Sequence, residues 1–174
     1  ITAVYADGNG YCVADENGLA CFDAQNNRTA LIRDLSGASA LSGGAGTLAL
    51  KEGKVYTYSA ETGVVGLLIV DADFFIENIA VTGEGIYCSY GDRIIRYSLE
   101  GVRDDGFTIV CEGAVAGMTS FNDKIYYSVV NGARCDIYEA GKEEAVYAGL
   151  YSFGKIAATS DNIYAVDKTG NLAF

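Results

Sequence analysis

Five acidic residues are the side chains of this sequence best suited to chemistry. The chain has no histidine, which excludes Ser-His-Asp triads and histidine acid–base catalysis. Pairs of Asp and Glu can hydrolyse glycosidic bonds, and five such residues fall in or beside predicted loops: Asp34, Asp71, Asp73, Glu77 and Glu112. None lies in the middle of a predicted strand. We therefore interpret them as ligand-binding loop acids, with a carboxylate-based glycoside hydrolase as an alternative.

Motifs for phosphates and metals are weak throughout the chain. Gly43-Gly44-Ala45-Gly46 could cradle a phosphate, but no Lys-Ser/Thr follows and no helix begins there, so a tight turn is favoured. Asp15–Gly18 and Asp71–Asp73 lack EF-hand spacing and are predicted turns. Without histidine or a CxxC pair, zinc is disfavoured. The sequence thus predicts no metal, no cofactor and no enzyme activity.

The five cysteines leave one disulfide open as an alternative. Cys12 and Cys21 face each other across a hairpin if Asp15–Gly18 is a four-residue turn, which would allow a cross-strand bridge. The interpretation that we favour is that Cys12, Cys88 and Cys111 are small hydrophobic residues buried in strands.

Charge and hydropathy limit the partners of the chain. A net charge of −11 repels polyanions, which argues against nucleic acid and against anionic lipid. The most apolar stretch, 64–70, is only strand length, so membrane insertion is not predicted. The chain begins at Ile1 without an initiator methionine, which indicates a piece of a longer protein. We expect an extracellular or cell-surface protein from a bacterium.

Three columns of residues recur about every 38 positions along the chain. The intervals in the first column are 37, 38, 39 and 38 residues. Its members are Val4, Leu41, Ile79, Met118 and Ile156. A second column of mainly tyrosines holds Tyr11, Leu48, Tyr87, Tyr126 and Tyr164, and a third holds Phe22, Tyr58, Tyr97, Tyr138 and Phe174. Such a period predicts a repeat architecture.

Each repeat is predicted to form four short strands separated by polar turns. In the third repeat the expected strands are Glu77–Thr82, Ile86–Tyr90, Arg93–Ser98 and Phe107–Cys111. Four antiparallel strands in this length are the blade of a β-propeller, whereas β-helix coils are shorter and parallel. First strands rich in small residues, such as Ala157 and Ala158, suit the crowded axis where blades meet.

Two short segments carry a resemblance to known propeller families. Ile125-Tyr126-Tyr127-Ser128, followed by Asp136-Ile137-Tyr138, resembles the YWTD repeats of low-density-lipoprotein-receptor-like propellers. The segment from Tyr58 to Gly63 is similar to the third-strand ending of PQQ-like repeats. The resemblance implies an all-β β-propeller and leaves function open. The expected blades are 1–37, 38–75, 76–113, 114–152 and 153–174, which form either a single propeller domain or the C-terminal part of a larger propeller.

The last repeat is expected to form an incomplete blade, since only the segments 154–160, 162–166 and 171–174 read as strands. An open blade edge could accept a strand from another copy, so self-association there is one expectation. The favoured function is a non-catalytic binding or interaction module of a larger secreted or surface protein, with a protein or glycan ligand. The alternatives are a structural subunit that assembles through that edge and the glycoside hydrolase.

Overall fold

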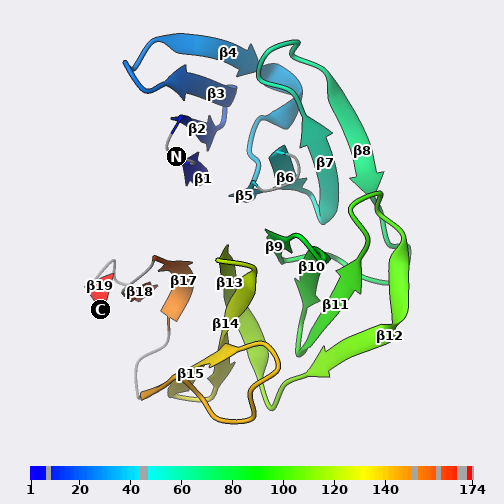
Figure 1. Cartoon of the computed structure of the whole chain (residues 1–174), viewed down its shortest axis with the longest axis vertical. Coiled ribbons are helices and arrows are strands. Elements are labelled where there is room, and N and C mark those ends of the chain that lie inside the picture. The colour runs from blue at the N-terminus through cyan, green and yellow to red at the C-terminus, as the bar shows by residue number, and fades with distance from the viewer. Residues whose placement is uncertain (7–8, 44–46, 150–152, 160–161, 168–171, 174) are drawn as a thin grey trace. The chain divides into compact units, whose positions relative to one another are not determined.

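Every sheet of the protein is an antiparallel meander of strands that are consecutive in the sequence (Figure 1). The computed structural model describes residues 1–6, 9–43, 47–149, 153–159, 162–167 and 172–173. These residues divide into two units, Ile1–Ile76 and Glu77–Phe174. Among them, no helix is long and apolar enough to cross a membrane.

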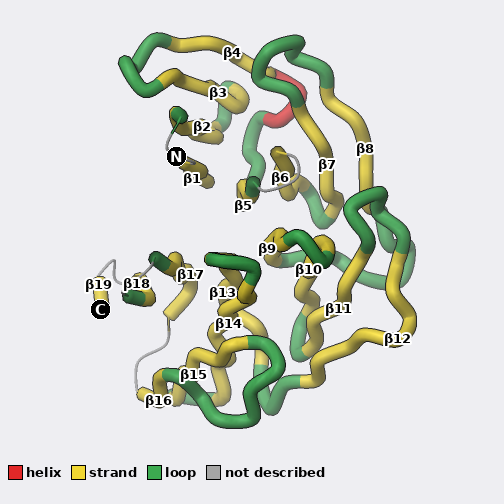
Figure 2. The backbone as a smooth tube through the Cα atoms, in the orientation of Figure 1, coloured by secondary structure: helices red, strands yellow, loops and turns green. Residues whose placement is uncertain are grey.

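The first unit contains two four-stranded sheets. The first sheet consists of β1 (Ala3–Ala6), β2 (Gly10–Asp15), β3 (Gly18–Asp23) and β4 (Arg28–Ile32). The second consists of β5 (Ala40–Ser42), β6 (Thr47–Lys51), β7 (Lys54–Tyr58) and β8 (Val65–Ile69). A short 3-10 helix, η1 (Arg33–Leu35), follows β4 and is red in Figure 2.

The second unit contains two four-stranded sheets and one of three strands. The third sheet is formed by β9 (Asn78–Thr82), β10 (Gly85–Tyr90), β11 (Arg93–Tyr97) and β12 (Arg103–Val110). The fourth is formed by β13 (Ala114–Phe121), β14 (Lys124–Asn131), β15 (Arg134–Glu139) and β16 (Tyr147–Gly149). The last is formed by β17 (Phe153–Ala158), β18 (Ile163–Asp167) and β19 (Leu172–Ala173). The fold is thus all-β and built of propeller blades, as predicted.

A side-chain cap marks the turn between β2 and β3. The Asp15 carboxylate accepts hydrogen bonds from the backbone N–H groups of Asn17 at 2.7 Å and Gly18 at 3.2 Å. These bonds close the β2–β3 hairpin and hold the pKa of Asp15 below its usual value. The predicted turn at Asp15–Gly18 is therefore confirmed. Of the predicted turn Gly43-Gly44-Ala45-Gly46, only Gly43 lies among the described residues.

Apolar residues form a core between neighbouring sheets of each unit, and Tyr58, Tyr87 and Met118 of the repeating columns belong to these cores. In the first unit, Leu19 and Ile32 of the first sheet pack with Ala49 and Tyr58 of the second. In the second unit, a core of the same kind contains Ala80, Tyr87, Ile94, Val115, Met118, Ile125, Tyr127 and Val129. Burial of this apolar surface is the main favourable term for such small sheets, because an isolated meander exposes both faces.

First strands of neighbouring sheets lie side by side within each unit (Figure 1). In the second unit, Asn78 of β9 donates from Nδ2 to the Ser89 hydroxyl at 2.9 Å and to the Val115 carbonyl at 3.2 Å. In the first unit, the Thr2 hydroxyl donates to the Ala38 carbonyl at 2.7 Å. Polar bridges thus join the sheets where their first strands meet.

The fourth strand of the third repeat is longer than predicted. We expected Phe107–Cys111, but β12 runs from Arg103 to Val110. Arg103 pairs with Tyr97 across a register shift between Ile95 and Tyr97. The strand opens with four polar or glycine residues, which are poor strand formers and were therefore not expected to belong to it. The sheet tolerates them there because β12 is an edge strand, which needs no apolar outer face.

The structure also contradicts our preference for Cys12 as an unbridged thiol. Cys12 and Cys21 are direct partners in the β2–β3 register and form a disulfide, with their Cα atoms 4.1 Å apart. Such a short separation is typical of the closer kind of antiparallel pair. Cys88 is a buried thiol, as predicted, whereas Cys111 is only half-buried.

The half-buried Cys111 and the buried Tyr127 predict a loss of stability at alkaline pH. Burial raises the pKa of Cys111 from 9.0 to about 11, and Asp92 adds to the shift. Burial likewise raises the pKa of Tyr127 from 10.0 to about 12. Both groups lose their proton at a lower pH in the unfolded chain than in the folded one. We therefore expect the free energy of unfolding to hold up to about pH 9 and then to fall as pH rises through these folded-state values.

Urea unfolding between pH 8 and pH 12, followed by circular dichroism, measures this slope. Tyr127→Phe should make it shallower, whereas Tyr126→Phe, on the neighbouring position of the same strand, is the matched control. Equal slopes in the two variants would contradict the assignment to Tyr127.

Candidate functional site

The predicted acids of the first unit lie in exposed or half-exposed connections. Asp34 is exposed in η1, where its backbone carbonyl accepts a hydrogen bond from Lys51 Nζ at 2.8 Å. Asp71 and Asp73 share the loop after β8, and the Asp71 carboxylate accepts the Asp73 N–H at 3.0 Å. That bond shapes an Asx turn. The structure therefore brings Asp71 and Asp73 together in one loop.

The two predicted acids of the second unit lie at one end of the third sheet. Glu77 precedes β9, and its Oε2 accepts the Gly91 N–H of the β10–β11 turn at 3.0 Å. Glu112 is exposed between β12 and β13. Throughout the described part of the chain, no three Asp, Glu, Cys or His side chains gather closely enough to hold a metal ion. The acids thus shape loops and present negative charge to solvent.

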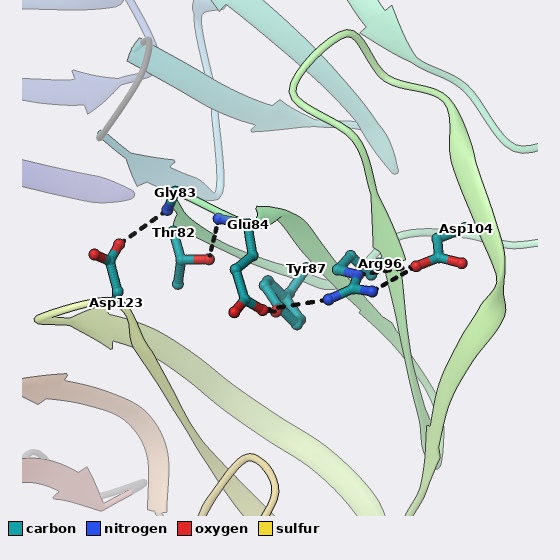
Figure 3. Close-up of polar contacts among 7 residues, drawn as sticks. All are labelled: Thr82, Gly83, Glu84, Tyr87, Arg96, Asp104 and Asp123. Atoms are coloured by element: carbon teal, nitrogen blue, oxygen red, sulfur yellow. Dashed lines mark hydrogen bonds and ion pairs between the residues drawn. The ribbon is translucent and has the colours of Figure 1, made fainter.

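An ion cluster around Arg96 occupies the other end of the third sheet (Figure 3). Arg96 of β11 donates from Nε at 3.0 Å and from Nη2 at 2.6 Å to one carboxylate oxygen of Asp104 on β12. Its Nη1 donates to Glu84 Oε2 at 3.3 Å. The Asp104 hydrogen bond raises the pKa of Arg96, and Arg96 in turn lowers the pKa of Asp104. Both groups stay charged at neutral pH.

Aromatic rings hold the Arg96 guanidinium in place. The guanidinium carbon lies 4.6 Å from the centroid of the Phe107 ring, a cation–π arrangement. Tyr87 packs edge-on against Phe107, with ring centroids 5.4 Å apart, and its hydroxyl donates to Glu84 Oε2 at 3.3 Å. The Arg96 guanidinium is therefore bound by two carboxylates and packs over the Phe107 ring, so its charge stabilises the fold.

One further hydrogen bond ties this end of the third sheet to the fourth, and another closes the β9–β10 turn (Figure 3). The Gly83 N–H donates to Asp123 Oδ1 at 2.9 Å, and the Glu84 N–H donates to the Thr82 hydroxyl at 3.2 Å. A surface hollow of about 570 Å³ opens beside Arg96. Its lining includes Arg103, which pairs with Asp105 at 3.3 Å. Because each arginine already faces a carboxylate, this hollow is not suited to a further anion.

The first unit holds a second hollow, a pocket of about 240 Å³ between its two sheets. Its lining residues are Tyr5, Asn9, Gly10, Tyr11, Cys12, Cys21, Phe22, Asp23, Thr29, Thr47, Tyr58 and Ala60. Among these residues Cys12, Cys21 and Tyr58 are buried, whereas Asn9 and Thr29 are exposed. Tyr11 and Phe22 stack with centroids 4.9 Å apart. Aromatic walls with a few polar groups are typical of ligand sites.

Gly43 explains how Tyr5 reaches the second sheet. Tyr5 belongs to β1, yet a Cβ at Gly43, just after β5, would overlap the Tyr5 ring and hydroxyl. The glycine therefore permits close approach of a side chain from the neighbouring sheet. Sequence reasoning missed this pocket because Tyr11, Phe22 and Tyr58 fall in the repeating columns, which predict a repeat architecture and not a ligand site. The signal that could have found it is Tyr5, which lies outside those columns.

Comparison with solved structures supports the propeller fold. A chain of the nidogen/laminin complex matches with a TM-score of 0.71 and 13% identity, over 96% of this chain and 71% of that one. The Neurospora crassa Pan2 WD40 domain matches with a TM-score of 0.68 and 10% identity, over 99% and 60%. A chain from the structure of BBS1N in complex with ARL6DN matches with a TM-score of 0.61 and 12% identity, over 97% and 62%.

These likenesses show the fold alone, since the identities are low. The chain spans less than two thirds of the matched Pan2 and BBS1N chains. No protein-family model matches the sequence, and no curated protein matches it at a significant level. The propeller repeat is thus confirmed, while the finer likeness to YWTD or PQQ-like repeats stays a prediction.

Proposed function

We propose that this chain is a non-catalytic interaction propeller that binds a positively charged partner protein through its acidic loops, within a larger secreted or surface protein of a bacterium. The observation that carries this proposal is the solvent exposure of the five predicted acids. Asp34, Asp73, Glu77 and Glu112 are exposed, and Asp71 is half-exposed. Asp71 and Glu77 accept hydrogen bonds from backbone N–H groups, which fix the loops while leaving their charge at the surface.

Three further observations support the proposal. The net charge of −11 favours a positively charged partner by long-range steering. Two of the matched structures are protein complexes, namely the nidogen/laminin complex and BBS1N with ARL6DN. The Cys12–Cys21 disulfide suits an oxidising compartment outside the cytosol.

Binding to extended peptides of graded charge tests the proposal. Lysine- and arginine-rich peptides should bind, and acidic peptides of equal length should not. Raising the salt from low to high concentration should weaken the binding, because exposed charges are screened. The double variant Asp71→Lys/Asp73→Lys should reduce the affinity by about tenfold or more, since it reverses two adjacent charges at the contact.

Glu143→Lys/Glu144→Lys is the matched control, because it makes the same charge change in the exposed β15–β16 connection. If both double variants weaken binding equally, only net charge matters and the assignment to the Asp71 loop is wrong. If no peptide of either charge binds, the proposed partner class is wrong.

A further inference from the structure

The pocket between the two sheets of the first unit carries an inference of its own. Four aromatic residues line it, namely Tyr5, Tyr11, Phe22 and Tyr58. Among the described residues that line it, Asp23 is the one acid, and none is a Lys or Arg. The pocket therefore combines aromatic rings with a carboxylate, and no positively charged side chain is among the described residues of its wall.

The Asp23 carboxylate is fixed in its position by its own loop. Oδ1 accepts the N–H groups of Gln25 at 2.9 Å and Asn27 at 2.8 Å, and Oδ2 accepts Asn27 Nδ2 at 3.0 Å. These bonds, those from Asn27 first, lower the pKa of Asp23, so the group stays ionised at neutral pH. A carboxylate has room for about four hydrogen bonds, which leaves capacity for a ligand.

We propose that this pocket binds an organic cation, an alkylammonium group, with the Tyr11–Phe22 stack against the cation and Asp23 as its counter-charge. Cations bind over aromatic faces, and cages of several rings recognise substituted ammonium groups in this way. A volume of about 240 Å³ accommodates such a group with its short alkyl stem, and is smaller than the pockets that hold drug-sized ligands.

This site is separate from the acidic loops of the proposed function. Asp71 and Asp73 lie in the connection that leaves β8 for the next sheet. The pocket instead includes Asn9 and Gly10, where β1 leads into β2, and Asp23, where β3 leads into β4. In an antiparallel meander these two kinds of connection fall at opposite ends of the strands. Either site can therefore fail without the other.

A titration with choline, followed by NMR or calorimetry, tests the proposal on the wild-type chain. The control ligand is the neutral isostere of choline in which carbon replaces the quaternary nitrogen. Choline should bind at least about tenfold more tightly than the isostere, because the two have the same shape and differ only in charge. Equal affinities would overturn the proposal, as would tighter binding of a neutral monosaccharide.

Two variants locate the binding. Asp23→Asn keeps an acceptor for the Gln25 and Asn27 N–H groups and removes the charge, so choline affinity should fall by about tenfold. Asp15→Asn is the matched control, because Asp15 caps the turn at the other end of the same hairpin. Tyr11→Leu should also weaken choline binding, and a melting curve confirms that the variant is folded. Undiminished binding in Asp23→Asn would place the cation elsewhere.

Two ligands distinguish the source of the cation. A blocked lysine amide carries the ammonium on a peptide-like stem, whereas choline represents a free small molecule. Tighter binding of the lysine amide indicates a side chain of a partner protein, and tighter binding of choline indicates a free quaternary amine. Binding of neither one overturns the proposal.

Discussion

Valine in place of Gly85 should destabilise the second unit by roughly 3 kcal/mol or more. Gly85 begins β10 with φ of +150°, a conformation that side chains rarely adopt. A Cβ at this position would also overlap the Tyr97 carbonyl oxygen on β11. Gly85→Val would therefore strain the backbone and push apart the strands that carry Tyr87 and Arg96. Urea unfolding followed by circular dichroism measures the loss.

Gly132→Ala is the control for backbone strain alone. Gly132 has φ of +62°, but a Cβ there meets no atom within 4 Å. Its replacement should cost only about 1 kcal/mol, the usual penalty for a side chain at positive φ. Gly85→Ala should fall between the two variants. If Gly85→Val is no worse than Gly132→Ala, β11 does not approach Gly85 as closely as the structure indicates.

The fold could be predicted from the sequence because burial follows the repeat. Ile79, Met118, Tyr58 and Tyr97 all occupy repeating columns and are all buried. The period of two in each strand and the turn residues between strands determine which side chains meet a neighbouring sheet. Burial is not uniform along the columns, because Val4, which heads the first column, is 58% exposed, and Tyr126 and Tyr138 are only half-buried. A column predicts a strand more reliably than it predicts the burial of each member.

The contacts at the candidate sites could not be predicted, because they depend on register and on distant segments. Arg96 meets Asp104 at a register shift in the β11–β12 pairing, and the residue pattern does not show where such a shift falls. Cys12 meets Cys21 only in one register of the β2–β3 hairpin. The pocket requires Tyr5 to cross to Gly43 on another sheet. A hydrophobic pattern specifies which face of a strand is buried, but leaves these pairings undetermined.

Replacement of Asn78 by aspartate should cost about 3 kcal/mol at neutral pH. Asn78 is only 7% exposed, and its Nδ2 donates to both Ser89 and the Val115 carbonyl. A carboxylate at this position cannot donate to that carbonyl, and it would be a charge in a buried place. Burial would raise the pKa of the new aspartate, so stability should increase as pH falls and the group takes up a proton.

Asn78→Leu separates the hydrogen bonds from the charge. It removes the same donors without adding a charge, so we expect a cost of about 1–2 kcal/mol that does not change with pH. A double-mutant cycle with Ser89→Ala measures the share of the Asn78–Ser89 bond, and the remainder belongs to the bond to Val115. That remainder matters most, because it is the part that joins β9 to β13. If Asn78→Asp and Asn78→Leu were equally stable at every pH, the site would be open to water, and the first strands of the third and fourth sheets would not be joined there.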